Sequence, residues 1–178
     1  MGKPVTVYQN GSAEAIPTID YGHQKIHEGY HFTAFYYVTV GASTAVTVLI
    51  TPPAAGSGRE IHFLCGISTN NTGIFTFSEN PVTTAGTLLT SANNYRSEAV
   101  DFPDPVVLSH TCTVDAASVG TVLETILTNT TTRANVSQGS AIRDEWILDG
   151  TYRYLMRFAA DNAATRVIFH LSYYYEDE

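Results

Sequence analysis

Charged residues are scarce in this chain, and long apolar runs are absent from it. Only 15% of its 178 residues are Asp, Glu, Lys or Arg, against about 25% in a typical soluble domain. No apolar run approaches the roughly 20 residues that a membrane-spanning helix needs, so we expect no membrane partner. The nine Lys and Arg residues are scattered and the net charge is −8. We therefore expect no nucleic-acid partner, because phosphate binding requires clustered basic side chains.

Cysteines are also few. Cys65 and Cys112 each lie in an apolar, strand-like pattern, and they can form a disulfide only if their strands adjoin. The first residues show no secretion signal, and disulfides are rare in proteins that stay in the cytosol, but the sequence leaves the pairing open. A chain of this length suits one domain that buries a core of its own. Neither a disulfide nor a metal ion is needed to stabilise such a fold.

The sequence is rich in short stretches in which apolar and polar residues alternate. In residues 165–175, one face carries Val167, Phe169, Leu171, Tyr173 and Tyr175. A period of two residues indicates a β-strand with one buried side. Further strands are predicted for residues 31–40, 44–51, 59–69, 72–78, 87–90, 106–114, 145–148 and 151–159. Many short strands separated by turn residues predict an all-β fold, an antiparallel β-sandwich or jelly roll.

Two segments do not follow this pattern. Residues 1–30 are polar with little periodicity, so we expect an extended N-terminal arm before a β-sandwich domain at 31–178. In the second segment, Val119, Val122, Leu123, Ile126 and Leu127 have the spacing of an amphipathic helix. The threonine-rich run at 128–132 disfavours a helix there. Both interpretations stay open, and we favour a strand.

His27, Glu28 and His31 match the H-E-x-x-H pattern of zinc metalloproteases. That chemistry requires a helix, so that two imidazoles four residues apart face one metal ion. Gly29 lies inside the motif, and the run after it strongly favours a strand. His23 extends the four-residue spacing, but the ordinary interpretation is that these histidines cap turns or pack at the start of the first strand. We interpret the match as coincidence.

The remaining polar candidates each have an ordinary structural explanation. His110 lies on an apolar strand face and is predicted to be a hydrogen-bonded core residue, whereas His62 and His170 lie on polar faces. Asp101 and Asp104 fit a solvated turn better than a calcium site. Trp146 is expected in the core, with the alternative that it anchors a partner. No nucleophile motif, phosphate loop or carboxylate pair is evident, so we expect no catalytic residue, no metal, no cofactor and no enzymatic activity.

Two segments carry a family resemblance. Residues 19–32, IDYGHQKIHEGYHF, resemble the opening "IDY-x-H-x-x-I-H-x-G-x-H-F" of a group of virion proteins from tailed bacteriophages. Residues 149–158 and 168–175, DGTYRYLMRF and IFHLSYYY, are similar to the final hairpin of the same group. The central NNYRS at residues 93–97 resembles its "NNNRNS" loop, from which Tyr95 and Glu98 depart. The resemblance implies a β-sandwich that assembles on the virion, and a strand at 119–127.

The leading hypothesis is therefore a non-enzymatic capsid decoration protein on the outer phage head. Its expected partners are the major capsid protein and itself, as a homotrimer, after synthesis in the bacterial cytoplasm. Contacts are expected from the arm, with Trp146 as a further candidate: Ile16, Ile19, Tyr21, Ile26, Tyr30 and Trp146. One alternative is an adaptor or receptor-binding module of the tail or fibre. A remote alternative is a metal-dependent hydrolase that uses His27, Glu28 and His31.

Overall fold

A computed structural model describes residues 8–9, 12–13, 21–84, 86–96, 105–115, 118–128 and 145–177. Its one helix among these residues is α1 (Tyr21–His27). The long strands are β3 (His31–Val40), β4 (Ala45–Thr51), β5 (Arg59–Thr69), β6 (Gly73–Glu79), β10 (Thr121–Thr128), β12 (Tyr154–Ala160) and β13 (Thr165–Asp177). The short strands are β1 (Tyr8–Gln9), β2 (Ser12–Ala13), β7 (Thr87–Leu89), β8 (Ala92–Asn93), β9 (Val107–His110) and β11 (Glu145–Leu148).

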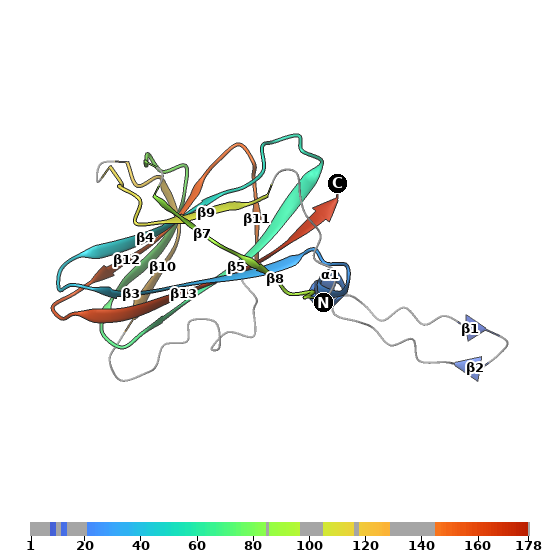
Figure 1. Ribbon diagram of the computed structural model, residues 1–178, viewed down its shortest axis with the longest axis horizontal. Coiled ribbons are helices and arrows are strands. Elements are labelled where there is room, and N and C mark those ends of the chain that lie inside the picture. Colours follow the sequence, from blue (N-terminus) through green and yellow to red (C-terminus); the bar gives the residue numbers. More distant parts are fainter. Residues whose placement is uncertain are drawn as a thin grey trace.

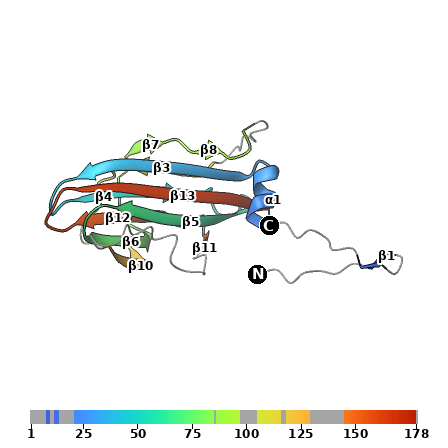
Figure 2. The same cartoon turned by 90° about the horizontal axis from the view of Figure 1, so that it is seen from below.

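Two antiparallel sheets pack face to face and enclose the core (Figures 1 and 2). One sheet has the order β11-β5-β13-β3-β8, and the other has the order β10-β6-β12-β4-β9-β7. The fully buried aromatic rings come from both layers and meet between them: Phe63, Phe75, Phe77, Phe158, Phe169, Tyr173 and Tyr175. β1 and β2 pair only with each other. The all-β sandwich predicted from the alternating pattern is confirmed.

The strand order is that of a jelly roll. Its eight strands, numbered 1 to 8 along the chain, are β3, β4, β5, β6, β10, β11, β12 and β13. In one sheet, strand 1 (β3) pairs with strand 8 (β13), strand 8 with strand 3 (β5), and strand 3 with strand 6 (β11). In the other sheet, strand 2 (β4) pairs with strand 7 (β12), strand 7 with strand 4 (β6), and strand 4 with strand 5 (β10). Eight strands in two Greek keys define this fold. β7, β8 and β9 are additions that extend the two sheets beyond β3 and β4.

Most predicted strands are confirmed, and the open segment at 119–127 forms β10, a strand. The run predicted at 106–114 is wrong after His110, because β9 ends there and Thr111 has a positive φ of 57°. This turn breaks the alternation. Cys112 therefore packs with Leu49 and Leu155 outside the main core, not inside it. Cys65 and Cys112 are both thiols and are not joined by a disulfide.

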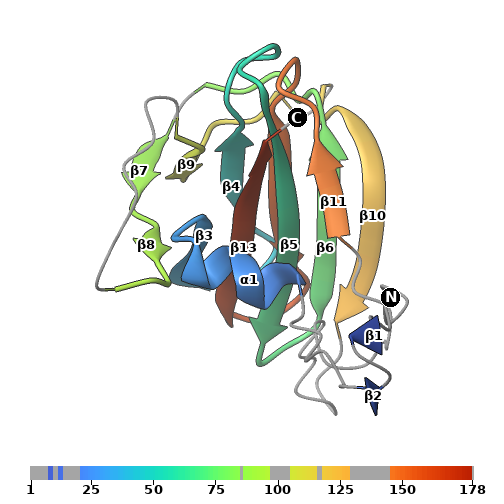
Figure 3. The ribbon, with the colours of Figure 1, turned by 90° about the vertical axis from the view of Figure 1, so that its right-hand side faces the viewer.

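The predicted extended arm is wrong for residues 21–27, which form α1. The helix lies across the end of the β5–β13–β3 region (Figure 3). The segment after it is tied to the sandwich, because the Gly29 carbonyl accepts a 2.7 Å hydrogen bond from Asn93 Nδ2 and the Tyr30 carbonyl accepts one of 3.2 Å from the Tyr175 amide. Residues 21–30 therefore belong to the folded body. No helix in the described part of the chain is long and apolar enough to cross a membrane.

Candidate functional site

The outward face of the β11-β5-β13-β3 sheet carries a group of titratable side chains. Side chains alternate along each strand, so Glu60 and His62 of β5 share this face while Ile61 and Phe63 fill the core. The strand register places Tyr174 directly opposite His62, and Glu176 directly opposite Glu60. The neighbouring strand β11 adds Glu145 from the other side. Three strands thus bring distant residues into one group, which we call the His62 cluster: Glu60, His62, Glu145, Tyr174 and Glu176.

His62 is the centre of this cluster. Its side chain is 13% exposed, and its Nδ1 lies 3.1 Å from Glu145 Oε1. The Tyr174 hydroxyl donates a hydrogen bond to the same carboxylate oxygen. The Tyr174 ring also stacks on the imidazole, with ring centroids 4.6 Å apart and planes 10° from parallel. These contacts hold the imidazole in one orientation, with Nδ1 toward Glu145.

The opposite edge of the imidazole faces two carboxylates. His62 Nε2 lies 2.8 Å from Glu176 Oε2, but the nitrogen is buried and makes no hydrogen bond. The oxygen is therefore close to the nitrogen without being aligned with it. One ligand atom each from Glu60, His62 and Glu176 lie within 4.8 Å of one another. Among the described residues, these are the three that can hold a metal ion as a group.

A second histidine site lies farther along the same face. His31 Nδ1 is 2.6 Å from Asn94 Nδ2, and His31 Nε2 is 3.1 Å from Ser172 Oγ. The Asn94 side-chain oxygen accepts a hydrogen bond from Thr33, which leaves its amide to donate to Nδ1. His31 is thus held as a neutral imidazole with a proton on Nε2. Burial lowers the pKa of His31 below its usual value of 6.5, because desolvation disfavours the charged form.

The environment of His31 predicts a loss of stability in mild acid. Below pH 6.5 the unfolded chain takes up a proton that the folded chain resists, so the free energy of unfolding falls as the pH decreases from 6.5 toward the folded pKa. We expect urea midpoints to be lower at pH 5.5 than at pH 7.5, and His31→Gln to reduce that difference. Burial also lowers the pKa of His170, so His170 adds to the loss of stability in acid. That part of the pH difference remains in His31→Gln. An unchanged pH difference in His31→Gln would refute this assignment.

Exposed aromatic side chains lie beside these histidines. Phe35 and Tyr37 of β3 are 60% and 59% exposed. Phe35 makes an edge-on contact with the His170 ring at 5.3 Å, and Ser68 lies 3.0 Å from His170 Nε2. Large exposed aromatic rings on a sheet face are typical of surfaces that bind other proteins. The face therefore offers both apolar contact area and polar groups to a partner.

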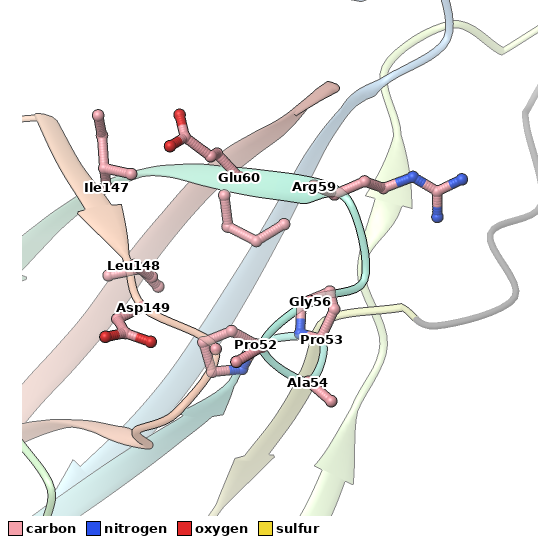
Figure 4. A pocket seen from close by; sticks show the side chains of 12 residues that line it. Pro52, Pro53, Ala54, Gly56, Arg59, Glu60, Ile147, Leu148 and Asp149 are labelled. Atoms are coloured by element: carbon pink, nitrogen blue, oxygen red, sulfur yellow. The ribbon is translucent and has the colours of Figure 1, made fainter. Parts of the chain in front are cut away.

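A small pocket opens at one end of the sandwich (Figure 4). It has a volume of about 260 Å³ and lies between the loop at residues 52–58 and the end of β11. Its lining includes Glu60 and Asp149, so it adjoins the His62 cluster. Gly150 lets the two loops approach, because a Cβ there would lie 2.3 Å from the Pro53 carbonyl oxygen. The pocket opens to solvent and is acidic on the side of Glu60 and Asp149.

The structure describes four of the six contact residues predicted from the sequence. Ile16 and Ile19 lie outside the described residues, and Tyr21 begins α1. Ile26 is half-buried, and Tyr30 is half-buried against the core with Lys25 Nζ 5.4 Å from its ring centre. Trp146 is half-buried, and its ring lies 5.6 Å from that of Phe77. The structure therefore gives Tyr30 and Trp146 a packing role, which leaves less of either ring for a partner.

The H-E-x-x-H match does not form a metalloprotease helix. α1 ends at His27, Gly29 has a positive φ of 77°, and His31 begins β3. Glu28 instead binds Lys25 Nζ at 2.9 Å, and His31 is held by Asn94 and Ser172. The two imidazoles therefore do not share one face of a helix. This agrees with the interpretation of the motif match as coincidence. His110, predicted in the core, is half-buried and stacks on Tyr36 with ring centres 4.1 Å apart.

The His62 cluster was not predicted from the sequence. Its members are far apart in the sequence, and only the pairing of β5 with β13 and β11 brings them together. One signal was available, because Glu60 and His62 lie two apart in a predicted strand and so must share a face. The polar face assigned to His62 is confirmed.

Comparisons with known proteins add no family to this description. No protein-family model matches the chain, and no curated protein matches it. Any assignment of function therefore rests on the fold, on the surface groups described above, and on the short motifs at residues 19–32, 149–158 and 168–175. The chain is a jelly roll, and the outward face of one sheet combines exposed aromatic rings with a half-buried histidine among carboxylates.

Proposed function

We propose that this protein is a non-enzymatic structural protein of a tailed-bacteriophage virion, and that it decorates the outer surface of the head. The observation that carries the proposal is the strand order of a jelly roll. Many viral capsid proteins have this fold. Fold alone does not define function, so the motifs at both ends of the chain supply the second support. The net charge of −8 suits a protein that is kept soluble beside packaged nucleic acid.

The proposed partners are the major capsid protein and further copies of this chain, as a homotrimer. The outward face with Phe35 and Tyr37 offers exposed apolar area for one of these contacts. The segment before α1, which contains Ile16 and Ile19, is the other candidate. Many copies on a lattice bind with avidity, so each contact can be weak while the whole layer stays attached. After synthesis in the bacterial cytoplasm, the protein would be located on the capsid surface.

Deletion of residues 1–20 tests the role of the arm. The cut leaves α1 and the hydrogen bonds of Gly29 and Tyr30 intact, so we expect the thermal midpoint to change by less than about 2 °C. We expect occupancy on undecorated heads to fall at least tenfold, because each copy loses the contact that avidity multiplies. Quantitative gel analysis of sedimented heads measures occupancy. Phe35→Ser with Tyr37→Ser, in the full chain, is the matched test of the sheet face.

If neither the deletion nor the double variant changes occupancy, the proposed contacts are wrong. If the full chain itself does not bind undecorated heads, the decoration function is wrong. Sedimentation of the free protein tests the trimer separately, with an expected mass of three times 19.3 kDa. A monomer that still decorates heads would contradict the trimer and leave the rest of the proposal intact.

A second candidate is an adaptor or receptor-binding module of the tail or fibre. The pocket beside Glu60 and Asp149 favours it, because jelly rolls also serve as lectin domains that hold small polar ligands between their loops. The number of copies in each virion separates the two functions. Hundreds of copies indicate the head, whereas a dozen or fewer indicate the tail.

A further inference from the structure

The His62 cluster concentrates negative charge around one imidazole. Glu60 and Glu176 are directly opposite each other on β5 and β13, and like charges in that position repel and destabilise a sheet. Glu145 adds a third carboxylate on the far side of the ring. Among the described residues, three carboxylates thus lie around the His62 ring, and those of Glu60 and Glu176 form a possible metal-binding group with it.

The geometry around the two ring nitrogens of His62 indicates which kind of cation fits. Nδ1 faces the Glu145 carboxylate at 3.1 Å, so Nδ1 carries the proton and donates it. In the neutral tautomer, Nε2 then presents a lone pair toward the carboxylates of Glu60 and Glu176. Nε2 is buried and has no hydrogen bond, with a carboxylate oxygen only 2.8 Å away. A lone pair and an anion at that distance repel each other unless a positive charge lies between them.

We propose that Glu60, His62 and Glu176 bind a divalent first-row transition-metal ion, with Zn²⁺ as the best fit. One neutral imidazole and two carboxylates are donors that Zn²⁺ accepts, at about 2.0–2.2 Å each. The three donor atoms lie within 4.8 Å of one another, so small side-chain rotations bring them around one ion. The pocket next to Glu60 leaves room for water at the remaining position.

Glu145 and Tyr174 are positioning residues for this site. A metal-binding histidine commonly donates its second N–H to a carboxylate, which fixes the tautomer and makes the ring a better donor. Glu145 accepts that bond, and Tyr174 both donates to Glu145 and stacks on the ring. The ion would join β5 to β13, two neighbouring strands of one sheet. This inference does not depend on the function proposed above, because it concerns what the folded chain binds, wherever it is located.

Metal titration of the full-length protein tests the site. The protein is stripped with a chelator and titrated at pH 7.5 with Zn²⁺ by calorimetry and with Co²⁺ by visible absorption. We expect one equivalent to bind, and the thermal midpoint to rise with added Zn²⁺ because the ion binds only the folded state. We expect His62→Ala to weaken binding at least 100-fold and Glu176→Gln at least tenfold. Glu145→Gln should weaken it by about 10–100-fold, as other second-sphere changes do.

His170→Ala is the matched control. His170 lies on the same sheet face, with its Nε2 3.0 Å from Ser68 Oγ, so its removal tests non-specific binding to surface histidines. We expect the His170→Ala protein to bind Zn²⁺ with the same affinity as the unchanged protein. Circular dichroism checks that every variant is folded, and Glu60→Gln provides a second ligand change at a half-buried position.

Three results would overturn the proposal. The first is no binding of Zn²⁺ or Co²⁺ at millimolar concentration. The second is binding of unchanged affinity in folded His62→Ala or Glu176→Gln protein. The third is a nitrogen NMR spectrum in which both His62 ring nitrogens stay protonated at pH 7.5 with Zn²⁺ present, because a proton on Nε2 would then supply the positive charge.

Discussion

Replacement of Phe169 by alanine is expected to lower the free energy of unfolding by about 3–5 kcal/mol, the usual cost of removing a buried phenylalanine. Phe169 is fully buried at the centre of β13, the strand between β5 and β3. Its ring lies 6.3 Å from that of Tyr36 and 6.5 Å from that of Phe75, which belongs to the opposite sheet. The variant therefore leaves a cavity between the two layers.

Urea unfolding of Phe169→Ala and of the unchanged protein measures this effect. Phe35→Ala is the matched control, because Phe35 lies on the strand beside β13 but is 60% exposed. We expect the control to change stability by less than about 0.5 kcal/mol. Equal effects of the two substitutions would mean that the core does not lie between these sheets, and the face assignment would be wrong.

Gly120→Ala is expected to cost at least about 2 kcal/mol, through backbone strain at positive φ and a steric clash. Gly120 has a φ of 85° and immediately precedes β10. A Cβ at this position would lie 2.1 Å from the carbonyl oxygen of Glu79. The two segments cannot easily separate, because Ser78 Oγ donates to the Val119 carbonyl at 2.8 Å and the Val82 amide donates to the Ser118 carbonyl at 2.9 Å.

Gly58→Ala separates strain from clash. Gly58 has a similar φ of 72°, but a Cβ added there would meet no atom within 4 Å, so only the strain of about 1–2 kcal/mol applies. Urea midpoints of the two variants compare the costs directly. A Gly120→Ala protein that is as stable as Gly58→Ala would show that β10 does not pass this close to the end of β6.

The parts of the fold that were predicted correctly are those where local pattern and final environment agree. β3, β5 and β11 begin and end where the alternation does, at residues 31–40, 59–69 and 145–148. In each of them, one face meets the core and the other meets solvent. The predicted end of β9 failed for a different reason. Thr111 adopts a positive φ, which threonine rarely does. The residue types at this position therefore do not predict a turn.

α1 could not be predicted because its stability comes from tertiary contacts. Seven residues are too few for a helix that is stable alone, and Gly22 lowers helix propensity further. Instead, Lys25 is buried, and the segment after the helix is hydrogen-bonded to the sandwich through Gly29 and Tyr30. The His62 cluster was missed for a related reason. Alternation tells which residues share a face of one strand, but only the register between strands decides which of them become neighbours.

The place of β13 in its sheet has a consequence for biosynthesis. This strand lies between β5 and β3, yet it follows every other strand along the chain. While a ribosome is still making residues 165–177, β3 and β5 have no shared neighbour and their backbone hydrogen-bonding groups are open to other chains. Assembly of the sandwich must wait until that segment emerges, and nascent chains on crowded polysomes pass through an interval in which aggregation competes with folding.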